Sequence, residues 1–445
     1  MHVRPVPLLV QWTMTPMALL TNELFCGEDD DLLLKAFLLS VGAVFGGEAK
    51  ERRNRSAFEQ RLIWNDYSEK HVARGTFKRR MRMDKDSFDK LLSYIYNDLL
   101  VDEKQANRRG GPVIPELCLY CTLRWLAGGS YLDITDIAGI SKTAFYTVIW
   151  RTITALVMCP QLSIHFPTTE KELLEAVGGF ASISTECAIK NCVGVVDGYL
   201  MRIKVPNKKE VPNVRSFFSG HYQCYGVNIQ AVADHHSRFV FFAVAGPGVI
   251  KDREAVRGCA LKKMLDNLPL GYCIIGDSAY EGSEHLVPIY SGLDRLKTKY
   301  DNFNYYASQC RIRIEMAFGL MQIKWGILQR PIGVRLNNLK WMAQAIARLH
   351  NFVVNERLAK REDPMNEIRV QAESGRATCH PTVPHDRNGD PIILNQLFNG
   401  THEGHSHLRE EMVRRVEMLR LSRPAENKIK KDSNNNSRLC DPHLD

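Results

Sequence analysis

Several features are missing from this 445-residue sequence. It has no uninterrupted apolar run of 18 residues, so we expect no membrane-spanning helix. Apolar patches within the first 20 residues are broken by Arg4, Pro5 and Pro7, and we expect no signal peptide. No internal repeat is evident. These absences argue against a membrane protein and against a repeat architecture.

The cysteines also lack a metal-binding pattern. Only Cys118 and Cys121 form a CxxC pair among the twelve cysteines, and no second pair accompanies them. The pair lies in the apolar run LCLYCTLRWL, which favours buried thiols on a helix over a zinc site. Free thiols throughout the chain would suit a reducing compartment.

The composition is that of a soluble globular protein. Hydrophobic residues make up 44% and charged residues 24% of the chain, and its length suits two to three domains. The formal net charge of +9 fits a polyanionic partner. Net charge describes association and not fold, so nucleic acid binding needs further evidence.

Patterning divides the chain into four parts. Residues 1–55 form a poorly defined leader, and residues 56–165 are predicted to be a helical, helix-turn-helix-like domain. Residues 185–352 alternate short apolar β runs with helices, which indicates an α/β domain. Residues 353–445 are polar, and we expect a largely irregular C-terminal tail.

The helix-turn-helix outline lies in residues 130–153. A short helix is followed by a turn at Gly139, and Ser141 is placed to cap a second helix. That second helix would present Lys142, Thr143 and Tyr146 to a DNA groove. Ordinary packing of two helices explains the same pattern, and both interpretations stay open.

Two β runs of the α/β part are each predicted to end in an aspartate. CVGVVDGYLMRIKVP (192–206) is predicted to deliver Asp197 to the end of a strand, and YCIIGDSAY (272–280) ends in Asp277. Glycines beside Asp197 mark close approach by a ligand or by another backbone. A later helix over residues 310–328 carries Glu315. Parallel neighbouring strands would bring both aspartates to one edge of a sheet.

Three converging carboxylates without a His or Cys partner suit a hard cation such as Mg²⁺ or Mn²⁺. Two such ions could clamp the attacking and leaving oxygens of a phosphodiester. Simpler explanations exist for single residues. Asp197 could be a capping or salt-bridged residue, and Glu315 could form an i,i+4 ion pair with Arg311.

Basic side chains follow the first predicted strand, and we expect them to track a DNA backbone. Arg311 is expected to hold Glu315 or a phosphate. The basic residues that follow the first predicted strand are Lys204, Lys208, Lys209 and Arg215.

Around these acids the chain resembles the PIF/Harbinger transposases and the nucleases derived from them. The family's Asp-Gly strand end matches Asp197-Gly198, and its GDSxY motif matches Gly276 to Tyr280. Its R-x-x-x-E-x-x-F-G helix matches Arg311 to Gly319, and its Leu-His-Asn element matches Leu349 to Asn351. The PGS-x-HD element is kept in part, since Asp252 matches the acid but Lys251 replaces the histidine. Tyr199-Leu200 also replaces the frequent Thr-His, which puts substrate handling in question.

The resemblance implies an RNase H-like mixed sheet with flanking helices, the core of a DDE nuclease. It implies Asp197, Asp277 and Glu315 as catalytic and metal ligands, with Asp252 as a further ligand, and two Mg²⁺ or Mn²⁺ ions. It also implies cleavage of duplex DNA at transposon ends with strand transfer, residence in the nucleus, and a separate Myb-like partner protein. Apart from the resemblance, we expect a homo-oligomer and keep the cytoplasm as a second location. No membrane partner is expected.

Two rival functions stay open at this point. A domesticated, catalytically inactive DNA-binding or nuclear interaction protein could retain the same acids. An RNase H-like enzyme acting on RNA or on hybrids would use the same chemistry.

Overall fold

The structure is a computed structural model, and it describes residues 60–101, 111–362 and 407–424. The leader predicted for residues 1–55 lies outside these ranges, as does much of the predicted C-terminal tail. None of the described helices is long and apolar enough to cross a membrane. All described residues belong to one compact unit that begins at Glu59.

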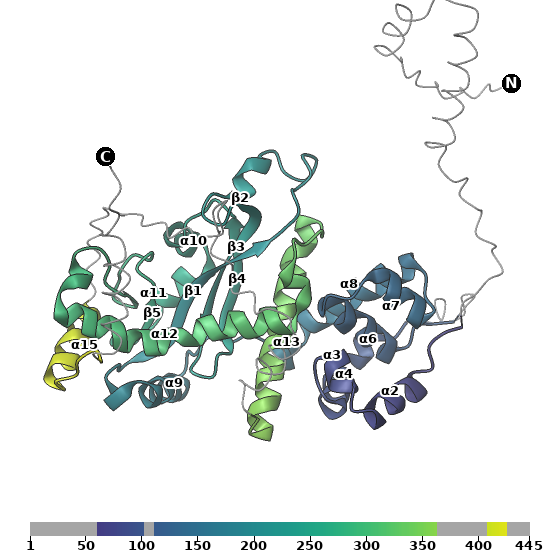
Figure 1. Cartoon of the computed structure of the whole chain (residues 1–445), viewed down its shortest axis with the longest axis horizontal. Helices are drawn as coiled ribbons and strands as arrows, with labels where there is room; N and C mark the ends of the chain where they lie inside the picture. Colours follow the sequence, from purple (N-terminus) through teal and green to yellow (C-terminus); the bar gives the residue numbers. More distant parts are fainter. Residues whose placement is uncertain (1–59, 102–110, 363–406, 425–445) are drawn as a thin grey trace, which may run out of the picture. The chain divides into compact units, whose positions relative to one another are not determined.

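A helical region comes first, coloured purple to blue in Figure 1. Its helices are α2 (Trp64–Ala73), α3 (Phe77–Met81), α4 (Lys85–Leu99), α6 (Pro115–Leu126), α7 (Tyr131–Ala138) and α8 (Lys142–Met158). Cys118 and Cys121 are both buried in α6, as expected, and are free thiols. Trp64 stacks on Phe88 at 4.9 Å between ring centroids, so aromatic packing joins α2 to α4.

Two helices and a turn occur where the sequence predicted a helix-turn-helix outline. Gly139 ends α7 in the left-handed conformation, and the Ser141 hydroxyl accepts a hydrogen bond from the Ala144 N–H at the start of α8. Lys142, Thr143 and Tyr146 are exposed on α8. Phe145, Val148 and other residues of the opposite face of α8 are buried in the core.

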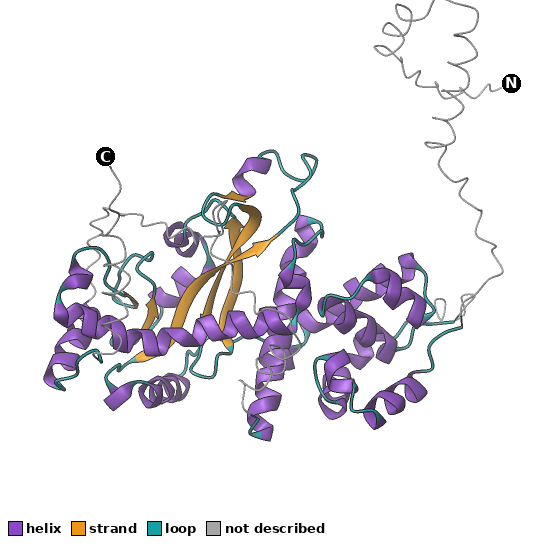
Figure 2. Ribbon diagram, in the orientation of Figure 1, coloured by secondary structure: helices purple, strands orange, loops and turns teal. Residues whose placement is uncertain are grey.

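A six-stranded mixed sheet forms the centre of the second region, as Figure 2 shows in orange. The strands are β1 (Cys192–Arg202), β2 (Phe218–Ser219), β3 (Cys224–Ala233), β4 (Phe239–Pro247), β5 (Cys273–Gly276) and β6 (Leu286–Pro288). β3 pairs antiparallel with β1, β2 and β4, whereas β1, β5 and β6 are parallel neighbours. The predicted mixed α/β architecture is therefore confirmed.

Helices cover both faces of the sheet. On one face, Val195, Ile229 and Ile275 belong to a core shared with α12 (Thr298–Lys324) and α13 (Leu336–Lys360). On the other, Val196, Val232 and Ile274 pack with α9 (Glu170–Ile183), α10 (Asp252–Gly258) and α11 (Ala260–Asp266). Short 3₁₀ segments occur at Pro160–Leu162, Thr185–Cys187, Val214–Phe217, Asp294–Leu296 and Gly326–Gln329.

Helix α13 locks the β3–β4 hairpin through the Leu-His-Asn element. Asn351 bonds both backbone groups of Phe239 at 2.7 Å, and His350 Nε2 donates to the Ser237 carbonyl at 2.8 Å. Burial lowers the pKa of His350 to about 4, so the ring is neutral. The Leu-His-Asn element therefore holds α13 against the β3–β4 hairpin.

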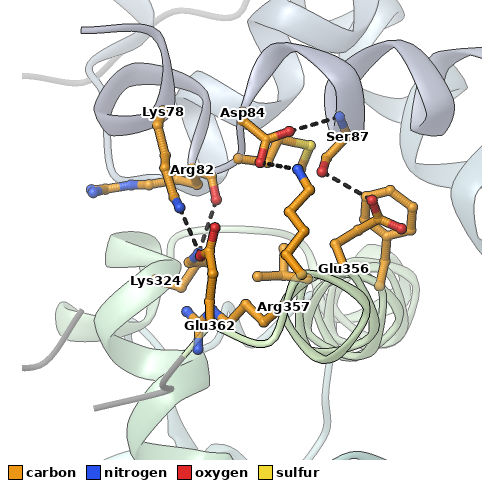
Figure 3. A pocket seen from close by; sticks show the side chains of 12 residues that line it. Lys78, Arg82, Asp84, Ser87, Lys324, Glu356, Arg357 and Glu362 are labelled. Carbon is orange, nitrogen blue, oxygen red and sulfur yellow. Dashed lines mark hydrogen bonds and ion pairs between the residues drawn. The ribbon is translucent and has the colours of Figure 1, made fainter. Parts of the chain in front are cut away.

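Ionic contacts attach the helical region to the same helix (Figure 3). Lys78 pairs with Glu362 at 2.8 Å, and Lys90 pairs with Glu356 at 2.7 Å. Asp84 caps α4 and also pairs with Lys360. Residues of α3 and α4 thus meet the end of α13 through opposite charges.

One element of the C-terminal part was not predicted. Helix α15 (His407–Met418) packs on α12, and the guanidinium of Arg409 lies 4.2 Å from the ring centroid of Tyr290, which follows β6. Arg423 pairs with Asp301 of α12 at 2.9 Å. The polar composition concealed this helix because only Met412, Val413 and Val416 supply its buried face.

Candidate active site

The first acid does not stand at the end of its strand, which corrects the sequence prediction. β1 continues to Arg202, and Asp197 pairs with Ala231 of β3 in the middle of the strand. The reason is the length of β3, whose antiparallel ladder extends β1 well beyond Asp197. Only the parallel pairing with β5 stops earlier, at Val195.

Asp277 follows β5 in a matching place. Val195 of β1 pairs with Ile275 of β5, and each aspartate comes two residues after its paired residue. The two strands run in the same direction, so Asp197 and Asp277 lie at the same side of the sheet. The parallel neighbours expected from the sequence thus occur.

Asp197 is a half-buried acid whose charge is disfavoured. Its pKa is raised to about 7, chiefly by burial, and the neighbouring carboxylates of Asp277 and Asp252 contribute in the same direction. Arg311 and the Gly198 N–H, which donates to Asp197 Oδ1 at 2.8 Å, act in the opposite direction. Three acids therefore share one electrostatic neighbourhood.

Asp252 enters this neighbourhood from the first turn of α10. Its Oδ1 accepts hydrogen bonds from Asn228 at 3.1 Å and from Gln230 at 2.8 Å. A Cβ on Gly198 would stand 2.2 Å from the same oxygen, so a larger residue there would displace the Asp252 carboxylate. The sequence predicted close approach by a ligand or by another backbone beside Asp197, whereas the atoms that approach Gly198 belong to the side chain of Asp252.

Gln230 connects Asp252 to the segment that carries Asp277. It is fully buried on β3, and its Oε1 accepts a hydrogen bond from the Tyr280 hydroxyl at 2.8 Å. Its side chain therefore bridges Asp252 and the Tyr of the GDSAY motif. We did not predict Asn228 and Gln230. Two polar residues at alternate positions of the apolar strand YGVNIQAVA were the available signal.

Glu315 lies on α12 and is the most exposed of the acids. Its side chain is 56% exposed, and Oε1 lies 3.4 Å from Arg311 Nη2. The same nitrogen lies 3.7 Å from Asp197 Oδ2. The i,i+4 pair is therefore present, and Arg311 joins Glu315 to Asp197.

The basic residues expected to contact DNA occupy two different environments. The first four are exposed after β1: Lys204, Lys208, Lys209 and Arg215. Arg311 is 12% exposed and faces carboxylates. The exposed four residues are thus accessible to a DNA backbone, whereas Arg311 forms ion pairs with Asp197 and Glu315.

Comparison with known proteins gives one match. The sequence of residues 196–351 matches the family described as DDE superfamily endonuclease. This part of the chain is a DDE endonuclease-type domain. No match was found among curated proteins or among solved structures.

The DDE endonuclease-type domain contains all four acids and ends within α13. Asp197 is the second residue of the matched range, and Asn351 is its last. The helices α2 to α8 precede the match. The comparison therefore supports a transposase-type nuclease in general, with the acids inside the matched part.

DDE endonucleases typically use divalent metals, and the donor chemistry here suits one. Hard carboxylate oxygens are the ligands that Mg²⁺ and Mn²⁺ prefer, and Asp197 carries unfavourable negative charge. Within residues 60–101, 111–362 and 407–424, however, no three His, Cys, Asp or Glu side chains are gathered closely enough to hold a metal ion. The residue types fit, whereas coordination would require the side chains to move together.

Proposed function

We propose that the chain is a divalent-metal-dependent DNA endonuclease of the Harbinger type, with an RNase H-like core. Asp197, Asp277 and Glu315 would hold the cations, and Asp252 would be a further ligand. The observation that carries the proposal is the electrostatic neighbourhood of Asp197, Asp277 and Asp252 inside a DDE endonuclease-type domain.

The chain's own residues supply binding and positioning. Arg311 holds Asp197 and Glu315 toward each other, and Gln230 fixes Asp252. Two bound cations would neutralise the phosphodiester and stabilise its attacking and leaving oxygens. The exposed Lys204, Lys208, Lys209 and Arg215 would bind backbone phosphates.

The substrate and setting are part of the same proposal. Duplex DNA at transposon ends is cut in the nucleus, with strand transfer by the freed 3′-hydroxyl. A Myb-like partner protein and a homo-oligomer assist, and Lys142, Thr143 and Tyr146 of α8 offer an exposed contact for a DNA groove. The family resemblance supports these points. Retention of the acids in a matched endonuclease domain favours an enzyme over an inactive binding protein.

A cleavage assay tests the proposal. Duplex DNA is incubated with the purified chain and Mg²⁺ or Mn²⁺, alongside Asp277→Asn and, as a matched control, Glu284→Gln from the same segment. We expect Asp277→Asn to abolish cleavage and Glu284, which is exposed, to be dispensable. Cleavage that survives Asp277→Asn would overturn the site.

Parallel arms with matched RNA and hybrid duplexes define the substrate. Preference for DNA supports the proposal. A preference for RNA or for hybrids would assign the domain to the RNase H-like alternative.

A further inference from the structure

A basic cavity lies where the helical region meets the end of α12. Its volume is about 440 Å³, which is within the usual range of ligand sites, about 300–1,000 Å³. Three arginines from separate segments line it: Arg82, Arg124 and Arg330. Backbone from the turn after α6 and from the segment after α12 completes the wall.

Two crossing turns build the cavity. A Cβ on Gly326 would stand 2.6 Å from the Ala127 carbonyl oxygen, so the turn after α6 and the turn after α12 touch through their backbones. Arg330 Nη2 donates to the Gly128 carbonyl at 3.0 Å and spans the junction. The cavity is thus held by both regions of the chain.

The charge of the cavity is positive. Among its lining residues in the described part of the chain, none is acidic. Arg124 and Arg330 donate to backbone carbonyls, which are neutral and leave the formal charge in place. Three guanidinium groups around one hollow suit a phosphate group, which accepts several N–H bonds at once.

The backbone of Arg82 has an unusual conformation. It ends α3 with φ 65° and ψ 8°, a left-handed conformation that favours glycine. A non-glycine residue in this conformation is strained and persists where its surroundings hold it. Its carbonyl accepts from Lys324 of α12 at 2.9 Å, which fixes the arginine at the cavity.

We propose that this cavity binds a backbone phosphate of a DNA strand at a distance from the acids. The inference rests on the proposed function. Arg202 of β1 donates to the Gln329 carbonyl of the cavity wall at 2.7 Å, and it follows Asp197 by five residues. Five strand residues span about 16 Å. The Arg202 side chain adds to that span before it reaches the wall, and one DNA strand advances about 3.4 Å per nucleotide, so the cavity would hold a phosphate several nucleotides from the acids.

The salt dependence of DNA binding tests this site. Binding of a short duplex is measured over a salt series for the wild-type chain and for the double variant Arg124→Gln/Arg330→Gln. Loss of one phosphate contact should flatten the slope of log K against log salt by about 0.9. Arg330→Lys keeps the charge and should retain most of the slope.

Two controls separate this effect from charge and from folding. Arg295→Gln removes one exposed positive charge elsewhere in the chain and should leave the slope unchanged. The unfolding midpoint of each variant shows whether it folds. If the double variant does not fold, Arg330→Gln alone gives the test, because Arg330 is exposed.

The outcomes distinguish this inference from the proposed function. An unchanged slope in the folded variants overturns the proposal that the cavity binds a DNA phosphate. Loss of cleavage in Asp277→Asn would still support the nuclease. A flattened slope supports the cavity even where Asp277→Asn cleaves like the wild type. Tight binding of pyrophosphate that needs Arg124 and Arg330, with an unchanged duplex slope, would assign a small phosphate compound and overturn the DNA assignment.

Discussion

Arg311 Nη2 lies 3.7 Å from Asp197 Oδ2, so a guanidinium from the long helix α12 faces the acid in the middle of β1. The positive charge opposes the increase in the pKa of Asp197 that burial and two neighbouring acids cause. The pair links the two parts of the sequence that carry the first and last acids of the site.

Asp197→Asn should stabilise the metal-free protein. Burial raises the pKa of Asp197 from 3.8 to about 7, so its ionised form is disfavoured in the folded state. The unfolded state therefore binds fewer protons between these values, and stability falls as pH rises from 3.8 to about 7. We expect a gain of roughly 1–2 kcal/mol at pH 8 after allowance for solvent screening.

The pH dependence of that gain is the check. Urea unfolding at several pH values should show the advantage of Asp197→Asn to be full above about pH 7 and to shrink toward pH 4. Glu284→Gln should show no such trend. A variant that is less stable than the wild type at pH 8 would contradict the electrostatic account.

The two ion pairs of Arg311 should differ in strength. Asp197 is 26% exposed, whereas Glu315 is 56% exposed and its pair is screened by water. Double-mutant cycles with Arg311→Gln should give a coupling of about 1 kcal/mol with Asp197→Asn and about 0.3 kcal/mol with Glu315→Gln. A larger coupling to Glu315 would be inconsistent with the geometry.

Gln230→Met should destabilise the fold and weaken cleavage. The substitution leaves the buried Tyr280 hydroxyl without its acceptor and Asp252 with one donor fewer. An unsatisfied buried polar group costs about 1–3 kcal/mol. Chemical denaturation measures this cost, and Tyr280→Phe, which removes only one of the two bonds, should lose less. Wild-type stability in Gln230→Met would show that the hydrogen bonds of Gln230 do not stabilise the fold.

Asp84 should stabilise the contact between α4 and α13 through two roles. Burial raises its pKa, but hydrogen bonds from Lys360 and Ser87 outweigh burial and lower the pKa to about 2. Asp84→Ala loses the helix cap and the ion pair, which should cost about 1–2 kcal/mol, whereas Asp84→Asn keeps a capping side chain and should lose less than about 1 kcal/mol.

Acid titration of stability separates the two roles of Asp84. Its folded-state pKa is lowered, so the contribution of the charge is full above pH 3.8 and is lost as pH falls toward 2. Thermal unfolding at pH 6 and at pH 2.5 should therefore show the wild type converging on Asp84→Asn. An equal gap at both pH values would exclude the ion pair as the cause.

Much of the fold could be predicted from local sequence patterns. The β3–β4 hairpin was predictable because two apolar runs flank the polar turn DHHSR, and α8 was predictable from Ser141 as its cap. Long-range pairing was less accessible. The length of β1 beyond Asp197 depends on β3, and no local signal in residues 192–206 reveals that partner.

The sequence named the acids but not the contacts between them. Asp197, Asp277 and Asp252 share an electrostatic neighbourhood, yet the hydrogen bonds of Gln230 depend on the register between β1 and β3. Likewise, the basic cavity joins Arg82, Arg124 and Arg330, whose proximity arises from tertiary contact. The prediction that the acids bind metal together is left for experiment.

The most direct test of the central claim is a Mn²⁺ titration followed by electron paramagnetic resonance on the wild-type chain, Asp197→Asn and Glu284→Gln. We predict about two bound ions in the wild type and in Glu284→Gln, with clear loss of binding in Asp197→Asn. Equal Mn²⁺ affinity and stoichiometry in all three proteins would contradict a metal-dependent nuclease site at Asp197.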